Sequence, residues 1–347
     1  METPPRSRLR LRFAGRTAAI AGALVNTEYV KSRIVTVFGG SGFVGRHVVR
    51  ALVKRGYRVR VAVRRPELAG FLQPLGQVGQ ITAVQANVRA QWSVERALSG
   101  ADAVVNLVGI LAERGAQRFQ AVHAGGARAV AESCRAAGIA NLAHVSAIGA
   151  DPQSASDYAR TKAIGEEAVR ATLPGAVIFR PSIQFGPEDN FFNRFAAMAR
   201  RSPALPLVGP RTRFQPVFVG DVAEAVARAI AGEAVRGTTY ELGGPEVKTF
   251  RELMELMLRE IGRRRILLPI PFPLARLMGA VLQYLPGQLL TLDQVRQLAV
   301  DNVVSAAAET EGRTLAALGI APTGLEAVLP SYLVRFRPRG QFERRAA

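Results

Sequence analysis

The chain of 347 residues carries a formal net charge of +19, and 48% of its residues are hydrophobic. This length and composition fit a folded protein with one large domain or two smaller ones and a substantial core. The single cysteine, Cys134, excludes an intrachain disulfide framework, and the three scattered histidines show no zinc-ligand spacing. We therefore expect a cytoplasmic protein from a reducing compartment, without a metal site.

Much of the positive charge lies near the two ends of the sequence. Residues 1–33 hold seven Lys and Arg against two acids, and residues 335–345 hold five arginines against one acid. Such ends are typical of solvated tails, and no aromatic residues interleave with the arginines as in RNA-binding proteins. The charge predicts an anionic membrane surface or an acidic protein as a partner, and no nucleic acid.

Residues 1–32 form a basic extension that we expect to be disordered. An arginine-rich stretch at 6–10 precedes an apolar stretch at 18–25, which superficially resembles a signal or transit peptide. The apolar stretch is too short to span a bilayer. A start site assigned too early is the alternative, because a chain that began near Val25 would lead directly into the first strand.

From residue 33 onward, apolar strands alternate with amphipathic helices. This alternation predicts an α/β fold of the Rossmann type, a doubly wound parallel sheet that helices cover on both faces. The expected elements are strands at 33–38, 57–64, 80–85, 103–109, 140–146 and 175–180, and helices at about 43–55, 93–99, 116–137 and 158–172.

After the sixth strand the alternation of strands and helices ends, because prolines mark long loops and helices dominate. We expect residues 33–185 to form the Rossmann domain and residues 186–347 a smaller, mostly helical C-terminal substrate or lid domain with a basic tail. Two short strands, at 217–221 and 239–242, are expected to return residues 215–245 to the first domain.

A glycine-rich turn separates the first expected strand from the first helix. Gly39, Gly42 and Gly45 would permit the tight turn, the approach of backbone to a pyrophosphate and the close packing of helix on strand. The helix start would add N–H groups for the phosphates. An ordinary βα turn is the alternative, but the strand and helix on either side favour an NAD(P) site. Its expected contacts are Gly39, Gly40, Ser41, Gly42, Phe43, Val44 and Gly45.

The end of the second expected strand predicts which nucleotide binds. Arg64, which Arg65 follows, stands where an NAD site usually places Asp or Glu. A guanidinium suits a 2′-phosphate and offers no acceptor to a ribose hydroxyl. The pair predicts NADPH over NADH, and two solvated arginines are the alternative. Further expected contacts follow the third and fourth strands: Asn87 (adenine, or a turn asparagine), Val108 and Gly109.

The fifth expected strand and the helix after it supply a candidate catalytic set. Ser146 ends the strand, and Tyr158 and Lys162 lie four residues apart, so they share one face of the helix. An ammonium there would lower the pKa of the phenol toward neutrality and could hold the nicotinamide ribose. The serine hydroxyl could donate to a substrate carbonyl. Tyr-x-x-x-Lys alone is common on exposed helices, but the serine and the glycine turn make the combination specific.

With these motifs the chain resembles the extended or atypical branch of the short-chain dehydrogenase/reductase superfamily over about residues 33–245. The resemblance implies NAD(P) binding and places Pro181 and Ser182 beside the nicotinamide. Many extended members carry an asparagine on the helix after strand four, where this chain has His123, which implies a less efficient proton relay. The matching pieces are Gly39, Gly42, Gly45, Asn87, Ser146, Tyr158, Lys162 and Arg180-Pro181-Ser182.

Longer stretches, at 37–43, 180–193, 214–222 and 240–245, resemble the NADPH-binding accessory subunits of respiratory complex I and their bacterial relatives. That resemblance implies a nucleotide held mainly as a structural element, with complex I subunits as partners, at the inner face of the cytoplasmic membrane. Two functions stay open beside it. One is an active NADP-dependent oxidoreductase or epimerase on a carbonyl, sugar-nucleotide or quinone- or isoprenoid-like substrate. The other is a redox-sensing regulator that binds NADPH without chemistry.

An apolar stripe near the C-terminus predicts an amphipathic helix over 274–285, which ends before Pro286. The first interpretation is that the stripe packs on its own domain, and the alternative is a docking face for a membrane or a partner subunit. No apolar stretch is long and proline-free enough to span a bilayer. The stripe consists of Leu274, Leu277, Met278, Val281, Leu282 and Leu285.

Overall fold

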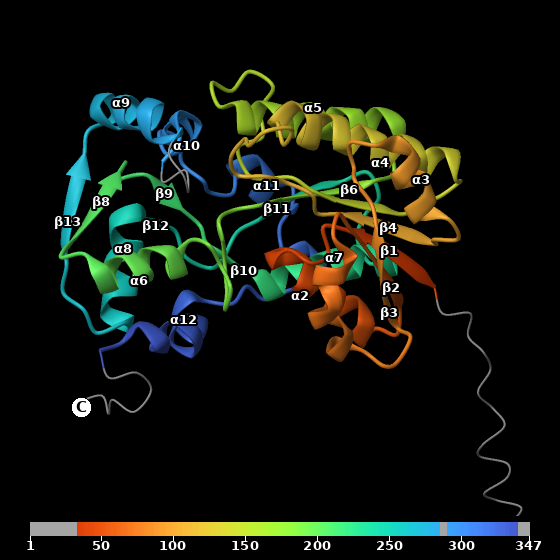
Figure 1. Cartoon of the computed structure of the whole chain (residues 1–347), viewed down its shortest axis with the longest axis horizontal. Helices are drawn as coiled ribbons and strands as arrows, with labels where there is room; N and C mark the ends of the chain where they lie inside the picture. The colour runs from red at the N-terminus through yellow and green to blue at the C-terminus, as the bar shows by residue number, and fades with distance from the viewer. Residues whose placement is uncertain (1–32, 285–289, 339–347) are drawn as a thin grey trace, which may run out of the picture. The chain divides into compact units, whose positions relative to one another are not determined.

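The computed structural model describes residues 33–284 and 290–338. The expected extension at 1–32, Leu285 of the apolar stripe and the tail beyond Pro338 lie outside the described residues. The central feature is a seven-stranded parallel sheet with the order β11-β6-β5-β4-β1-β2-β3 (Figure 1). Its strands are β1 (Ile34–Phe38), β2 (Arg58–Val63), β3 (Ile81–Gln85), β4 (Ala103–Asn106), β5 (Leu142–Val145), β6 (Val177–Pro181) and β11 (Thr239–Leu242).

Helices cover both faces of this sheet, which confirms the predicted Rossmann-type fold. Val35 and Val37 of β1 pack toward α2 and α7, while Phe38 and Val104 pack toward the helices of the opposite face. Side chains alternate along a strand, so strands buried on both faces must be apolar at nearly every position. One face carries α2 (Phe43–Lys54) and α7 (Val219–Ala231), and the other α3 (Gln91–Leu98), α4 (Gly125–Ala136) and α5 (Asp157–Thr172) (Figure 1).

Two local features differ from the expected alternation. A 3₁₀ segment, η1 (Pro66–Leu75), connects β2 to β3, where no helix was expected. The helix expected at 116–137 begins as a π-helical turn, η2 (Gln120–Ala124), which continues into α4. That π-helical turn carries His123 and packs against α5.

The strand expected at 217–221 is wrong over most of its length. Only Val217–Phe218 form a strand, β10, which pairs with β7 (Gln184–Phe185) and not with the main sheet. The chain turns helical at Val219, because the apolar residues from there on recur at helical spacing and are buried along α7. The strand expected at 239–242 is confirmed as β11, which pairs in parallel with β6.

A second hydrophobic core lies among later elements of the chain. Phe192, Phe250, Leu253 and Leu329 are buried there, and aromatic rings meet edge to face within it. The division of the chain at residue 185 stays a prediction. The elements concerned are α6 (Phe192–Arg201), β8 (Ala204–Val208), β9 (Arg213–Phe214), β12 (Lys248–Thr249), α8 (Phe250–Glu260), β13 (Ile266–Ile270) and α12 (Leu325–Leu333).

The predicted amphipathic helix is α9 (Phe272–Leu282), and α10 (Leu292–Gln297) packs against it. Leu274, Leu277 and Val281 of the stripe are 50%, 65% and 60% exposed. The interpretation that these three side chains pack on their own domain is wrong, because the helix turns the small residues Ala275 and Gly279 inward. Among the described residues, no helix combines the length and the apolar character needed to cross a bilayer.

Candidate functional site

The glycine turn between β1 and α2 is built as a close-packed cradle. Gly39 adopts a positive φ of 79°, which L side chains rarely adopt. A Cβ on Gly45 would lie 2.3 Å from the carbonyl oxygen of Gly39, so helix and turn can approach this closely only with glycine. Gly42 is exposed and stands at the N-cap of α2, where no side chain caps the helix. The first N–H groups of α2 therefore suit a phosphate.

The remaining predicted nucleotide contacts follow the carboxyl ends of the neighbouring strands. Arg64 and Arg65 are exposed directly after β2. Asn87, after β3, forms an Asx turn in which its Oδ1 accepts the N–H of Arg89 at 3.1 Å. Val108, after β4, touches the turn, because its Cγ2 lies 3.4 Å from where a Cβ on Gly39 would be. The sheet thus brings these residues to one edge, where open parallel sheets bind ligands.

Ser146 and Lys162 both lie near this edge, with Lys162 against the residue before Ser146. The Lys162 ammonium donates to the carbonyl oxygen of Val145 at 3.2 Å and lies 3.2 Å from where a Cβ on Gly109 would be. Ser146 is only 4% exposed, and its Oγ has no hydrogen-bond partner among the described residues. A buried hydroxyl without a partner costs free energy, which a bound nucleotide or substrate could recover. The cradle and this hydroxyl fit an NAD(P) molecule.

Tyr158 lies on the same face of α5 as Lys162, and its ring packs edge-on against other aromatic rings. The ring centroid lies 6.0 Å from that of Phe119 and 5.2 Å from that of His123. Burial, and after it the charge of Asp293, raises the pKa of Tyr158 to about 12. Burial also lowers the pKa of Lys162 to about 8. The expectation that Lys162 brings the phenol pKa toward neutrality is therefore wrong for the chain by itself.

His123 is held neutral between two polar neighbours. Its Nε2 accepts the N–H of Ile110 at 3.0 Å, and its Nδ1 lies 3.1 Å from the Thr161 hydroxyl. Burial, followed by the charge of Lys162, lowers the pKa of His123 to about 2. Because Nε2 accepts, the ring proton belongs on Nδ1, where it is directed at Thr161. With both nitrogens engaged, His123 is poorly suited to shuttle a proton.

Beneath Lys162, a buried ion pair ties α5 to β6. Glu166 is 0% exposed and accepts from Arg180 Nε at 2.9 Å and Nη2 at 2.8 Å. Arg170 adds a third contact to the same carboxylate at 2.8 Å. This bidentate geometry fixes the helix that carries Tyr158 and Lys162.

The loop after β6 is fastened by Asn302, which the sequence analysis did not single out. The Ser182 hydroxyl donates to Asn302 Oδ1 at 2.7 Å, and the Ile183 N–H donates to the same oxygen at 2.9 Å. Asn302 Nδ2 reaches the carbonyl of Ile148, after β5, at 3.4 Å. Pro181 and Ser182 are buried, and the serine hydroxyl is engaged with Asn302. No pattern in the sequence pairs positions 182 and 302.

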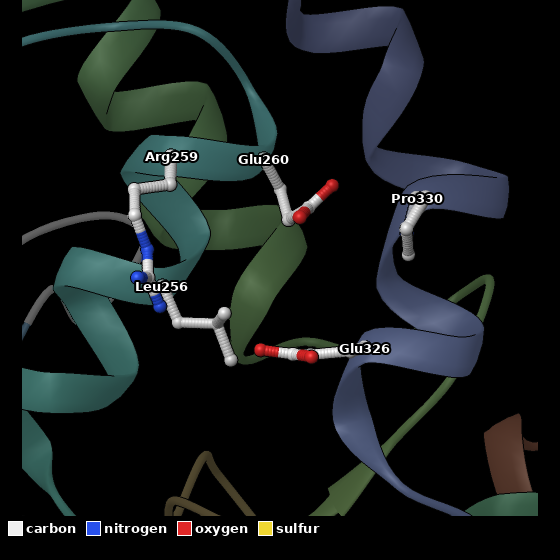
Figure 2. A pocket seen from close by; sticks show the side chains of 5 residues that line it. All are labelled: Leu256, Arg259, Glu260, Glu326 and Pro330. Carbon is white, nitrogen blue, oxygen red and sulfur yellow. The ribbon is translucent and has the colours of Figure 1, made fainter.

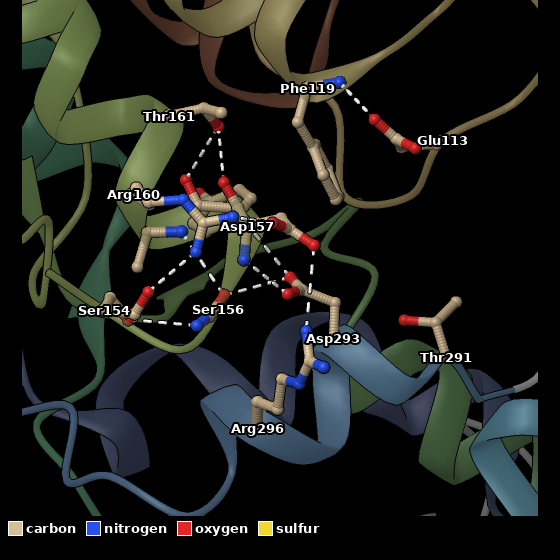
Figure 3. A network of polar contacts seen from close by, with 12 residues as sticks. Glu113, Phe119, Ser154, Ser156, Asp157, Arg160, Thr161, Thr291, Asp293 and Arg296 are labelled. Atoms are coloured by element: carbon tan, nitrogen blue, oxygen red, sulfur yellow. Dashed lines mark hydrogen bonds and ion pairs between the residues drawn. The ribbon is translucent and has the colours of Figure 1, made fainter. Parts of the chain in front are cut away.

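The sequence analysis also did not predict Asp293, because no sequence pattern pairs position 293 with the start of α5. It lies on α10 and contacts the first turn of α5, as Figure 3 shows.

Within the described residues, no group of three or more His, Cys, Asp and Glu side chains could hold a metal ion.

A separate hollow of about 550 Å³ lies between α8 and α12 (Figure 2). It is lined by Leu256, Arg259, Glu260, Glu326 and Pro330. None of these five is a predicted nucleotide or catalytic residue, so the hollow is not part of the candidate site.

Comparison with known proteins agrees with this geometry. Residues 35–243 match the NAD dependent epimerase/dehydratase family. The mitochondrial NADH dehydrogenase [ubiquinone] 1 alpha subcomplex subunit 9 of Arabidopsis thaliana is 34% identical over 90% of this chain and 80% of its own. The ceramide reductase of Caulobacter vibrioides is 37% identical over 55% of this chain and 58% of its own.

Among solved structures, the UDP-glucose 4-epimerase of Thermus thermophilus in complex with NAD aligns with a TM-score of 0.63 at 21% identity. The alignment covers 89% of this chain and 99% of that one. This likeness shows the fold, and the family match covers the cradle, Ser146, Tyr158 and Lys162. The chain therefore belongs to the NAD dependent epimerase/dehydratase family, the extended branch of the short-chain dehydrogenases/reductases.

Proposed function

We propose that this protein is an NADPH-binding accessory or assembly-associated subunit of a bacterial NADH:ubiquinone oxidoreductase (complex I). The observation that carries the proposal is the nucleotide cradle between β1 and α2. Gly42 leaves the start of α2 open to a pyrophosphate, whereas burial, and after it the charge of Asp293, raises the pKa of Tyr158 to about 12. The similarity to complex I subunits over most of the chain supports the same function. The nucleotide would then act mainly as a structural element.

The preference for NADPH is supported by the two arginines after β2. Arg64 and Arg65 are exposed, so either guanidinium is free to meet a 2′-phosphate. We expect Arg64→Asp to weaken NADPH binding by about 10- to 100-fold, the scale of one charged hydrogen bond, and to leave NADH binding nearly unchanged. The matched control is Arg58→Asp, at the exposed amino end of the same strand. Calorimetry that gives wild-type protein equal affinity for both nucleotides would contradict the preference.

A place at the inner face of the cytoplasmic membrane is supported by the exposed side chains of α9. Leu274, Leu277 and Val281 present an apolar ridge, and Arg276 on the same helix is exposed. Basic and apolar groups together favour an anionic lipid surface. We expect cell fractionation to recover the protein with membranes and with complex I subunits at low salt, and less of it at high salt. Full solubility at low salt without any complex I subunit would refute this function.

An active NADP-dependent oxidoreductase or epimerase is the second candidate. The buried, unpartnered Ser146 hydroxyl beside Lys162 favours it, as does the similarity to a reductase. In that case Ser146 would orient a substrate carbonyl and Tyr158 would exchange the substrate proton. Tyr158→Phe would then lower turnover on the order of 10²- to 10⁴-fold with little change in NADPH affinity. For an accessory subunit, the same variant keeps both NADPH binding and complex I abundance.

A further inference from the structure

The first turn of α5 is capped by a side chain from far along the chain. Asp293 Oδ1 accepts the N–H of Asp157 at 2.6 Å, and its Oδ2 accepts the N–H of Tyr158 at 3.3 Å (Figure 3). The hydroxyl of Ser156, the N-cap residue, donates to Asp293 Oδ2 at 3.0 Å and accepts the N–H of Ala159 at 3.3 Å. The first three N–H groups of the helix are therefore all satisfied, two of them by Asp293.

The carboxylate of Asp293 is itself held in place. Gln297, one turn further along α10, donates to its Oδ2 at 2.9 Å. The start of α10 is fixed by a capping box in which Thr291 and Gln294 bond each other's backbone N–H groups. Asp293 is half-buried, so water competes only partly for its oxygens. The cap is thus a rigid contact between two helices.

We propose that Asp293 is a positioning residue for Tyr158: its carboxylate fixes the turn of α5 that carries the ring and places a negative charge against the backbone of that turn. The inference rests on the proposed function in one respect, namely that Tyr158 belongs to the nucleotide site.

The charged groups around Tyr158 support an electrostatic part for Asp293. Lys162, on the same helix, has its Nζ 6.0 Å from the ring centroid, and His123 on the facing π-helical turn is neutral. Asp293 contributes a negative charge from α10, which disfavours a phenolate. Burial is the larger cause of the raised pKa of Tyr158, and the charge of Asp293 is the second.

One further ion group lies at the same end of α5. The carboxylate of Asp157 pairs with Arg160 on its own helix and lies 3.7 Å from Arg296 of α10. One carboxylate and two guanidinium groups give these three side chains a formal charge of about +1, so they do not disfavour a phenolate. Asp293, which the structure pairs with N–H and O–H donors, is therefore the anion that acts on the phenol.

A titration of Tyr158 tests the electrostatic part. Phenolate absorbance after rapid pH jumps, with the Tyr158→Phe signal subtracted, isolates this tyrosine. We expect Asp293→Asn, which keeps an acceptor oxygen but no charge, to lower the titration midpoint by several tenths to about one pH unit. The matched control is Asp301→Asn, because Asp301 also accepts a backbone N–H, that of Arg213 at 2.7 Å. An unchanged midpoint in Asp293→Asn would overturn the proposal.

Amide hydrogen exchange tests the positioning part. We expect Asp293→Ala to speed exchange at Asp157 and Tyr158 on the order of tenfold, the scale of one lost cap, and Asp293→Asn to restore part of the protection. Unchanged protection in Asp293→Ala would contradict the proposal. Neither readout needs a nucleotide. A wild-type protein that binds no NADPH would therefore refute the proposed function, while the titration would still decide the role of Asp293.

Discussion

Adding a single methyl group to the glycine turn should separate folding from nucleotide binding. In Gly45→Ala the new Cβ would lie 2.3 Å from the Gly39 carbonyl oxygen and 2.6 Å from the Gly40 Cα. Both neighbours are backbone atoms, so the turn must shift. Alanine gains up to about 1 kcal/mol over glycine inside a helix, whereas overpacking costs about 1–3 kcal/mol and tends to the upper end against backbone. We expect a net loss of about 1–2 kcal/mol in the free energy of unfolding.

Gly42→Ala is the matched variant in the same turn. Gly42 has a φ of −73°, which any residue adopts, and the nearest atom to its new Cβ is the Gly39 oxygen at 3.2 Å. We expect its stability to fall by at most about 1 kcal/mol, less than in Gly45→Ala, because the Gly39 oxygen must give by only a few tenths of an ångström. NADPH binding should weaken, because the methyl group would face the bound phosphates. Urea unfolding and calorimetry give the two quantities. A Gly45→Ala protein as stable as wild type would refute the packing argument.

Two further predictions concern stability. Glu166→Ala should cost up to about 3 kcal/mol in urea unfolding, because the Arg180 guanidinium loses its bidentate partner and keeps only Glu241 at 3.6 Å, and a loss below about 1 kcal/mol would contradict this. Burial lowers the pKa of His123 to about 2 and that of His144 to about 3. Below pH 6.5 these histidines are therefore protonated in the unfolded chain and neutral in the folded one. The free energy of unfolding should fall on acidification by up to about 1.4 kcal/mol per pH unit per histidine. In His123→Asn the slope between pH 6 and 5 should be shallower, and an equal slope would speak against neutral burial.

The sheet was predictable because its signal is local. Strand β1 and the glycines after it lie next to each other in the sequence, and each buried strand can be recognised as an apolar run. Tyr158 and Lys162 share a helix face by spacing alone. The start of α7 was harder to predict, because Val217, Phe218 and Val219 are all strand-forming residues. Only the helical spacing of the later apolar residues indicates that a helix begins at Val219.

The supporting contacts of the site could not be predicted from the sequence. Asp293 and Asn302 act on residues more than 100 positions earlier, and nothing in their own neighbourhood marks them. The pKa of Tyr158 was predicted with the wrong sign because burial and a carboxylate from far along the chain raise it. Such terms depend on three-dimensional packing, which short-range patterns do not encode.

The remote cap on α5 has a consequence for how the protein folds as it is synthesised. The chain leaves the ribosome N-terminus first, so β6 emerges well before β11, which covers its outer edge. Until Thr239–Leu242 follow, that edge is open to pairing with other chains. Asp293 emerges later still, and only then does the first turn of α5 gain its cap. The turn that carries Tyr158 is therefore completed only after residue 293 has been synthesised, long after the glycine turn between β1 and α2.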